Sequence, residues 1–179
     1  MELNRFNSDL MKKWIFVLAI LALIIAVSGC TTSQQAPADK TYSINGLSFI
    51  YPGTWSELDK TSYQSALNGK GELLAVVGDG STMFGVARLN KIKNQTNVTL
   101  DNLIQYYNAT LNANGTEYVS ESPVTVDGVK GYKMTVKASE NYLSGVLFIK
   151  NSTAYLAVFE SSDNDQKTFN QILNSLKVS

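Results

Sequence analysis

A run of fourteen uncharged apolar residues near the start of the chain, Trp14–Val27, constrains what the sequence can fold into more than any other feature. Two lysines, Lys12 and Lys13, precede the run, and the small residues Ser28 and Gly29 follow it. As a helix the run would rise about 21 Å, whereas the hydrocarbon core of a bilayer is about 30 Å thick. A positive start, a short apolar stretch and a small-residue exit are the layout of a secretory signal. We therefore expect the globular fold to begin after this segment.

The cysteine that follows, Cys30, is the only one in the chain. The segment Val27-Ser28-Gly29-Cys30 resembles the lipobox of lipoprotein signal peptides, in which the cysteine thiol receives a lipid and the chain is cut just before it. The resemblance implies that residues 1–30 form a signal peptide with its lipobox, that Cys30 is lipidated, and that the lipid anchors the protein in the cell membrane. Residues 1–10 are polar, so Met11 is an alternative start.

The alternative interpretation of the same segment is an uncleaved N-terminal membrane helix, because tilting and anchoring side chains can let a short segment span. Both interpretations place residues 31–179 on the extracytoplasmic face of the membrane. Removing residues 1–30 from the 179-residue chain leaves 149 residues, which is enough for one domain with a sizeable core.

The charge of that domain excludes one class of partner. Three of the fifteen Lys and Arg residues and two of the fifteen Asp and Glu residues lie in residues 1–30, which leaves twelve basic against thirteen acidic residues. A nucleic-acid-binding domain carries a basic patch or stripe. We therefore expect no nucleic-acid partner.

The chain contains no histidine, so the commonest general base and the commonest metal ligand are both absent. Asp163-Asn164-Asp165 hints at a calcium loop, but Thr168 stands where such a loop requires glycine. We predict no catalytic residue, no metal and no cofactor. A hydrolase would instead need two acids facing one cleft or a serine–lysine pair, neither of which the sequence can place together.

Five Asn-x-Ser/Thr sequons offer glycan acceptors on an exported chain: Asn94, Asn97, Asn108, Asn114 and Asn151. Their number suggests an archaeal or eukaryotic type of cell surface, although loops rich in Asn and Thr also generate sequons by chance. Asn108 lies on the flank of an apolar helix face, so we expect it to be used least. Asn151 lies in a hairpin turn, so we expect it at an exposed tip.

The remaining pattern predicts an order of linker, strands, helix, strands and helix. Residues 31–40 are polar and read as a flexible linker, and residues 41–179 as the domain. Asn45-Gly46 is a favoured hairpin turn, which would put Tyr42, Ile44, Leu47, Phe49 and Tyr51 on one face and make Trp55 a core residue. Residues 57–70 read as irregular with one helical turn.

The second half alternates hairpins and amphipathic helices. Strands are predicted over 73–77, 83–89, 116–122, 124–126, 129–138, 142–150 and 154–160, with Pro123 restricting its strand to an edge or an interruption. A helix is predicted from Leu100, capped by Thr99 and ended by Gly115, and a second one carries Phe169, Ile172, Leu173 and Leu176 after a capping box at Ser162–Asp165. This order predicts an α+β domain with a central antiparallel sheet and helices packed on its faces.

Three motifs resemble the PsbP-like domains. The first is Gly46-Leu47-Ser48-Phe49-Ile50-Tyr51-Pro52-Gly53-Thr54-Trp55, and the second is Val126-Asp127-Gly128-Val129-Lys130-Gly131-Tyr132. The third is Ala154-Tyr155-Leu156 before a polar loop, followed by a helix ending Ile172-Leu173-Asn174-Ser175-Leu176-Lys177. The resemblance covers roughly residues 41–178. It implies a Mog1/PsbP-type α/β/α sandwich and a mainly non-catalytic role, and the histidines proposed as ligands in some members have no counterpart here.

Together these patterns predict a lipid-anchored extracytoplasmic protein with a non-catalytic PsbP-like binding or accessory domain, whose partner would be a protein or polysaccharide at the cell surface. The alternatives are a cell-surface hydrolase and a structural glycosylated component of the envelope.

Overall fold

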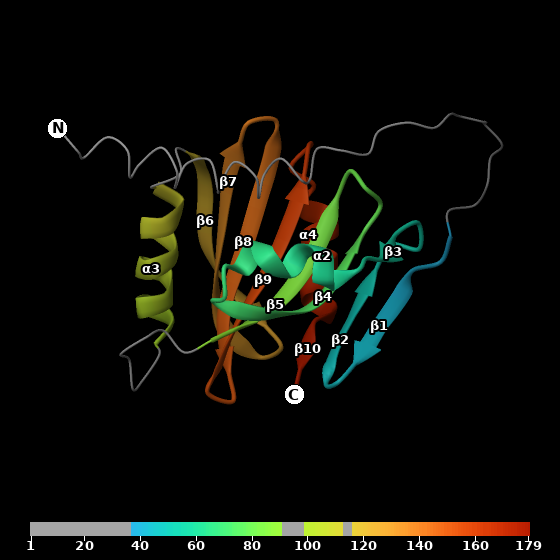
Figure 1. Cartoon of the computed structure of the whole chain (residues 1–179), viewed down its shortest axis with the longest axis horizontal. Helices are drawn as coiled ribbons and strands as arrows, with labels where there is room; N and C mark the ends of the chain where they lie inside the picture. Colours follow the sequence, from blue (N-terminus) through green and yellow to red (C-terminus); the bar gives the residue numbers. More distant parts are fainter. Residues whose placement is uncertain (1–36, 91–98, 113–115) are drawn as a thin grey trace.

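The computed structural model describes residues 37–90, 99–112 and 116–179, and its main element is a seven-stranded antiparallel sheet (Figure 1). The strand order is β3-β4-β5-β9-β8-β7-β6. The strands are β3 (Ser56–Glu57), β4 (Gly71–Gly78), β5 (Met83–Leu89), β6 (Glu117–Val126), β7 (Val129–Ala138), β8 (Asn141–Lys150) and β9 (Thr153–Ser161). Strands β8 and β9, which correspond to the strands predicted over 142–150 and 154–160, lie in the interior of the sheet.

A second, three-stranded sheet has the order β1-β2-β10. It consists of β1 (Lys40–Ile44), β2 (Leu47–Tyr51) and the two-residue β10 (Lys177–Val178). The register of the first hairpin is as predicted, since Ile44 pairs with Leu47 and Tyr42 pairs with Phe49. The sequence pattern did not predict β10, nor that the hairpin would form a sheet of its own.

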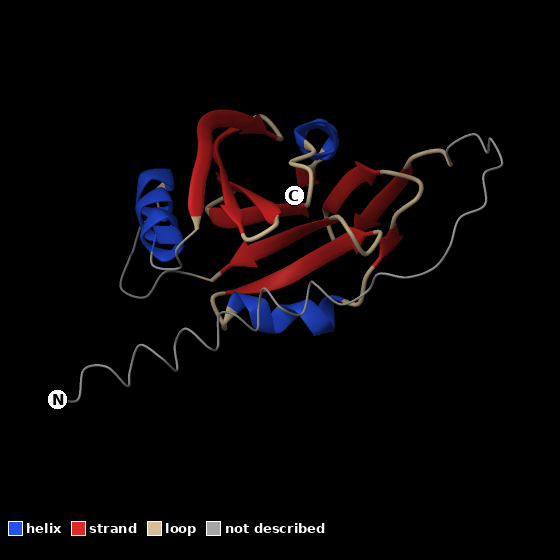
Figure 2. Cartoon of the chain, turned by 90° about the horizontal axis from the view of Figure 1, so that it is seen from above, coloured by secondary structure: helices blue, strands red, loops and turns tan. Residues whose placement is uncertain are grey.

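Four helical segments complete the described part of the chain: α2 (Lys60–Gln64), the 3-10 turn η2 (Ser65–Leu67), α3 (Leu100–Asn112) and α4 (Gln166–Ser175). Figure 2 shows α2 and α4 on opposite sides of the large sheet. On one face, α3 packs Leu103 against Leu147 and Leu156, and the α2–η2 segment packs Tyr63 and Leu67 over β4 and β5. The mixed α+β architecture with a large antiparallel sheet is therefore confirmed.

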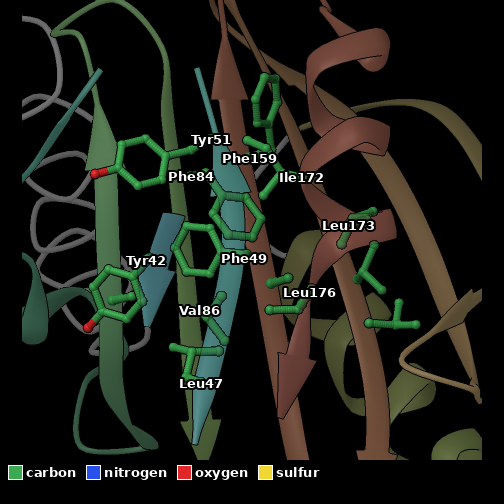
Figure 3. Close-up of a cluster of buried hydrophobic side chains, with 14 of the residues drawn as sticks. Tyr42, Leu47, Phe49, Tyr51, Phe84, Val86, Phe159, Ile172, Leu173 and Leu176 are labelled. Carbon is green, nitrogen blue, oxygen red and sulfur yellow. The ribbon is translucent and has the colours of Figure 1, made fainter. Parts of the chain in front are cut away.

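The main core fills the other face, between the large sheet, α4 and the small sheet (Figure 3). It is rich in aromatic rings: Phe49 packs edge-on to Phe84 at 5.1 Å, and Phe159 stacks on Phe169 at 5.0 Å. Trp55, predicted to be a core residue, is 4 % exposed and stacks on Phe159. Burying rings of this size is a dominant source of stability, so the hairpin and α4 are held on the sheet by one shared core.

Tight turns in the left-handed region connect the hairpins. Asn45 and Gly46 have φ of 51° and 80°, and Asp127 and Gly128 have φ of 49° and 79°. Two-residue turns with positive φ at both positions match the twist of the strands they join, and Asn, Asp and Gly tolerate that conformation best. This is why the turn residues predicted the hairpins correctly.

Two local predictions on the strands need correction. Ile44 was placed on the buried face, but 48 % of it is exposed. Its pair partner Leu47 lies between β1 and β10 and also pairs with Val178, whereas Ile44 ends β1, which is the outer strand of the small sheet among the described residues. Of the two alternatives predicted for Pro123, the edge position is confirmed, because β6 is an edge strand of the large sheet, where proline is tolerated. Only the division into strands 116–122 and 124–126 is wrong, since β6 runs continuously through Pro123.

The start of α4 also differs from the prediction. The cap is Asp165, whose Oδ1 accepts a hydrogen bond from the Thr168 N–H at 3.0 Å, and not Ser162. The reason is that β9 continues to Ser161 and Asn164 takes a φ of 55°, so the residues between them form the turn. The helix begins one turn later than the capping box suggested. The cap of α3 by Thr99 is confirmed, because its Oγ1 accepts from the Asn102 N–H at 3.2 Å.

Several predictions lie outside the described residues: the signal segment with Cys30, the loop over 91–98 with Asn94 and Asn97, and the end of α3 near Asn114 and Gly115. None of the helices in the described ranges is long and apolar enough to cross a membrane. The first strand of the structure, β1, begins at Lys40.

Candidate functional site

A polar groove of about 260 Å³ lies between the tip of the β1–β2 hairpin and the large sheet. The floor comes from β4, β5 and β9, and the walls come from the hairpin turn and from the residues at and after β10. Its lining residues are Asn45, Gly46, Leu47, Glu72, Leu74, Arg88, Tyr155, Val178 and Ser179.

A row of three polar side chains crosses the floor. Glu72 of β4 pairs directly with Arg88 of β5, and Arg88 pairs directly with Tyr155 of β9. Directly opposed residues of neighbouring strands point to the same face. The row therefore continues the core-facing side of the sheet, and Glu72 and Arg88 stand where that side reaches solvent.

The charged pair in this row is accessible. Arg88 Nη2 lies 2.5 Å from Glu72 Oε2, and both side chains are a little more than half exposed. An ion pair this exposed contributes about 1 kcal/mol or less to stability. Tyr155, in contrast, is buried and stacks on Phe148 at 5.3 Å, so it gives the floor a fixed aromatic edge.

The walls of the groove are held by backbone contacts. The Ser179 N–H donates to the Gly46 carbonyl at 3.0 Å, which fixes the hairpin turn against the residues after β10. A side chain at Gly46 would collide with the Ser179 hydroxyl, and Gly46 has a φ of 80°. The left-handed conformation therefore favours glycine at this turn, and a side chain there would also displace the Ser179 hydroxyl.

A second charged cluster, centred on Asp127, lies at the same end of the molecule but is closed. The Asp127 side chain is 9 % exposed and forms ion pairs with Lys150 and with Lys177, the latter at 3.3 Å. Its Oδ2 also accepts the Val178 N–H at 2.9 Å. Burial alone would raise the pKa of Asp127, but the hydrogen bonds from Lys150, Val178 and Lys177 outweigh it and hold the pKa below its ordinary value. This cluster fastens β10 to the β6–β7 hairpin and the end of β8.

A third polar cluster lies beneath the start of α4 and brings a lysine near a serine. Lys133 Nζ donates to Gln166 Oε1 at 3.1 Å, and Gln166 Nε2 donates to Ser144 Oγ at 3.0 Å. Burial lowers the pKa of Lys133. However, the Gln166 amide lies between the two groups, and Ser144 is 1 % exposed and shares a hydrogen bond with Thr135. The arrangement anchors α4 and offers no hydroxyl that a substrate could reach.

The chain enters the domain at the end opposite to the groove. Residues 37 and 38 lie directly against Gly53, where any side chain would meet their carbonyl oxygens. Asp39 accepts a hydrogen bond from Gln171 of α4 at 2.9 Å, and Lys40 Nζ donates to the Trp55 carbonyl at 2.6 Å. The five residues of β1 then span about 16 Å before the hairpin turn. Figure 1 shows the start of β1 and the turn at opposite ends of this hairpin.

Two of the predicted glycan acceptors fall within the described residues. Asn151 lies in the exposed β8–β9 turn with a φ of 50°, as predicted for a hairpin tip. Asn108 of α3 is half-buried, and its amide hydrogen-bonds to the Tyr132 hydroxyl, which in turn is bonded to Glu121. A glycan on Asn108 would break that contact. Glycosylation of either residue stays a prediction, as does the lipid on Cys30.

Sequence reasoning did not identify the groove residues. Glu72 and Arg88 are separated by 16 positions and carry no motif. A register shift between Leu73 and Ala75 also disturbs the count along β4. Within the described ranges, no group of three or more His, Cys, Asp or Glu side chains is arranged to hold a metal ion. Asp163-Asn164-Asp165 forms the turn and cap of α4.

Solved structures with similar folds include the cyanobacterial PsbP, CyanoP, from Synechocystis, at 15 % identity with a TM-score of 0.55, covering 86 % of this chain and 99 % of that one. Two weaker matches are a protein from Bacteroides thetaiotaomicron (13 % identity, 75 % and 45 % covered, TM-score 0.45) and a protein of unknown function from Pseudomonas aeruginosa (9 %, 74 % and 94 %, 0.43).

A comparison with curated proteins gives no match. The sequence profile of PsbP-like proteins, in contrast, matches residues 24–178, which is most of the chain. The match includes all three motifs noted in the sequence, and the fold agrees with that of the cyanobacterial protein. The chain therefore belongs to the family of PsbP-like proteins.

Proposed function

We propose that this protein is a lipoprotein, anchored through Cys30 on the extracytoplasmic face of the cell membrane, whose PsbP-like domain is a non-catalytic binding or accessory module. The observation that carries the proposal is the placement of two features: the chain enters the domain at one end, and the groove opens at the other. A domain held in this way presents its groove away from the membrane and toward a surface partner.

The contacts of residues 39 and 40, where the chain enters the domain, support this orientation. Asp39 and Lys40 are bonded to α4 and to the Trp55 turn, so the point where the chain leaves the domain is fixed. In the linker predicted for residues 31–40, only eight residues separate Cys30 from Asp39, which is short enough to keep this end near the headgroups. A two-chain lipid on Cys30 would supply the stable anchoring that a single chain does not.

Partner capture in native membranes tests the proposal. A photo-crosslinking residue is placed at Ile44, which is exposed beside the groove turn, and in a matched control at Thr54, which is exposed at the end where the chain enters the domain. We expect adducts with a defined surface component from position 44 and not from position 54. Equal labelling at both positions would contradict a partner that binds at the groove end of the domain.

The anchor is tested separately by mass spectrometry of the N-terminal peptide and by the variant Cys30→Ala. We expect acylated Cys30 in the membrane fraction of the natural chain and loss of that acylation in the variant. An unmodified Cys30 in a protein recovered from the cytosol would overturn the proposed localisation.

A structural glycosylated component of the envelope is the second candidate, and the exposed tip carrying Asn151 favours it. Glycopeptide mass spectrometry separates it from the first. A glycan on Asn151 with no crosslinked partner would favour the structural role, and an unmodified Asn151 would weaken it.

A further inference from the structure

We infer that the groove between the β1–β2 turn and the row Glu72–Arg88–Tyr155 binds one neutral sugar unit of a cell-surface glycan. The inference rests on the proposed function, because the sugar is the class of partner that we assign to the groove end of the anchored domain. It is carried by the charge balance, the two-sided lining and the size of the groove.

The charge balance of the groove disfavours an ionic ligand. Arg88 is the cationic side chain among the lining residues and Glu72 the anionic one, and they form an ion pair with each other. An anion would have to compete with Glu72 for Arg88, and a cation would have to compete with Arg88 for Glu72. A neutral ligand with hydroxyl groups can bond to the free donors and acceptors of both while the pair stays intact.

The lining has two chemical sides. Asn45, Glu72, Arg88 and Ser179 supply an amide, a carboxylate, a guanidinium and a hydroxyl. The apolar side consists of the half-buried Leu74 and the small exposed edges of the buried Leu47, Tyr155 and Val178. A sugar ring has the same division, with hydroxyl groups at its rim and C–H groups on its faces. A purely apolar ligand would leave the polar groups unpaired, which is costly.

The size of the groove limits the ligand to a single unit. Its volume of about 260 Å³ is below the roughly 300–1,000 Å³ of pockets that hold drug-sized ligands. The groove also lies where β4 starts and β5 ends, beside the exposed Asn45-Gly46 turn, so a longer glycan chain could continue into solvent from the bound unit.

The groove is built before any ligand arrives. The hairpin turn is fixed by the hydrogen bond from Ser179 to Gly46, and the Tyr155 ring is held by stacking on Phe148. Glu72 and Arg88 project from paired strands and not from loops. Preorganised groups lose little freedom on binding, which favours a measurable affinity for a small ligand.

Amide NMR spectra of the full chain in detergent micelles test the inference. The probes are methyl glucoside, methyl galactoside, methyl mannoside and N-acetylglucosamine, with inorganic phosphate as the anionic control and cyclohexanol as the apolar control. We expect at least one sugar to shift the signals of Gly46, Glu72 and Arg88 in a saturable way, with a dissociation constant on the order of 1 mM. Shifts from phosphate or cyclohexanol alone, or none from any sugar, would overturn the inference.

Variants separate a specific site from general effects. Arg88→Ala and Glu72→Ala should each weaken sugar binding about tenfold or more, because each removes charged hydrogen-bonding partners. Asn45→Gly keeps the left-handed turn and removes only the amide, so it should weaken binding by a smaller factor. Lys130→Ala, an exposed charge of β7 outside the groove, is the matched control and should leave binding unchanged. Equal binding by the Arg88, Glu72 and control variants would contradict the assignment.

The two proposals can fail separately. If crosslinking from position 44 recovers a protein partner and no sugar shifts the groove signals, the sugar assignment falls and the accessory function stands. If a sugar binds the groove but Cys30 is unmodified and the protein is cytosolic, the anchored function falls and the sugar site stands.

Discussion

Two charged clusters lie at the same end of the molecule, and water reaches them very differently. Asp127 is almost fully enclosed, and it accepts from two lysines and a backbone N–H. Glu72 and Arg88 are bonded to each other and are more than half exposed. The first cluster joins three segments of the chain, whereas the second joins two strands that already pair with each other.

The difference separates a structural carboxylate from one that is available to a ligand. A buried charge must have its hydrogen-bonding capacity filled by the protein, so little capacity remains for a partner. An exposed pair keeps donors and acceptors free and contributes little to folding. Asp127 lies in one of the family motifs, yet its contacts explain its presence through folding alone.

The largest effect is expected for Asp127→Ala. Removing the carboxylate leaves Lys150 and the Val178 N–H without their partner and places alanine at a φ of 49°, so we expect the free energy of unfolding to fall by about 3 kcal/mol. Urea denaturation followed by tryptophan fluorescence measures it. Asp127→Asn tolerates the turn conformation and should cost about 1–2 kcal/mol. Equal, small losses for both would show that the cluster does not hold β10.

The pH dependence of the same carboxylate gives the next largest effect. Because the pKa of Asp127 is held below its ordinary value, its contribution is complete at neutral pH and is lost as the pH falls below about 4 through the lowered pKa. The stability difference between the natural chain and Asp127→Asn should therefore shrink as acid is added. A difference that grows in acid would reverse the sign we expect. Denaturation curves at several pH values provide the test.

The two lysines of the Asp127 cluster should differ from one another. The Lys150 side chain is 24 % exposed and that of Lys177 is 60 % exposed. We expect Lys150→Ala to cost about 1–2 kcal/mol and Lys177→Ala less than about 1 kcal/mol, because solvent screens the more exposed pair. Thermal unfolding of the two variants side by side would measure this order. The opposite order would mean that exposure does not govern these pairs.

The smallest effect is expected in the groove. Glu72→Ala and Arg88→Ala should each change the free energy of unfolding by less than about 1 kcal/mol, since their ion pair is exposed. The same urea measurement applies. A loss comparable to that of Asp127→Ala would remove the distinction between the two clusters.

The sequence predicted the hairpins and the helices because their signals are local. Asn45-Gly46, Asp127-Gly128 and Asn151-Ser152 each determine a turn within two residues. The apolar spacing of Phe169, Ile172 and Leu173 likewise marks one face of α4 within three turns. The family motifs describe these same turns and core positions, so the resemblance and the fold agree.

The sequence could not predict what depends on pairing across long separations. Strand β10 has two residues and therefore no periodicity, and its partner in β2 is distant in the chain. The groove requires β4, β5 and β9 in register, and the register shift in β4 hides that alignment. The cap of α4 was misplaced because Ser161 belongs to β9, which only the pairing with Tyr142 reveals. Cys30 and the sequons over 91–98 and at Asn114 stay predictions.

The pairing of the first hairpin with β10 has a consequence for the order in which the protein folds. Gly46 bonds to Ser179, which is 133 positions away, and Asp39 bonds to Gln171, which is 132 positions away. Contacts between such distant positions form slowly, because a long loop must close before they are made. The meander from β6 to β9 can assemble by pairing strands that follow one another in the sequence. The first hairpin, in contrast, is covered only after α4 and β10 have formed. Until residues 166–179 are available, the first hairpin therefore lacks the helix and the strand that cover it.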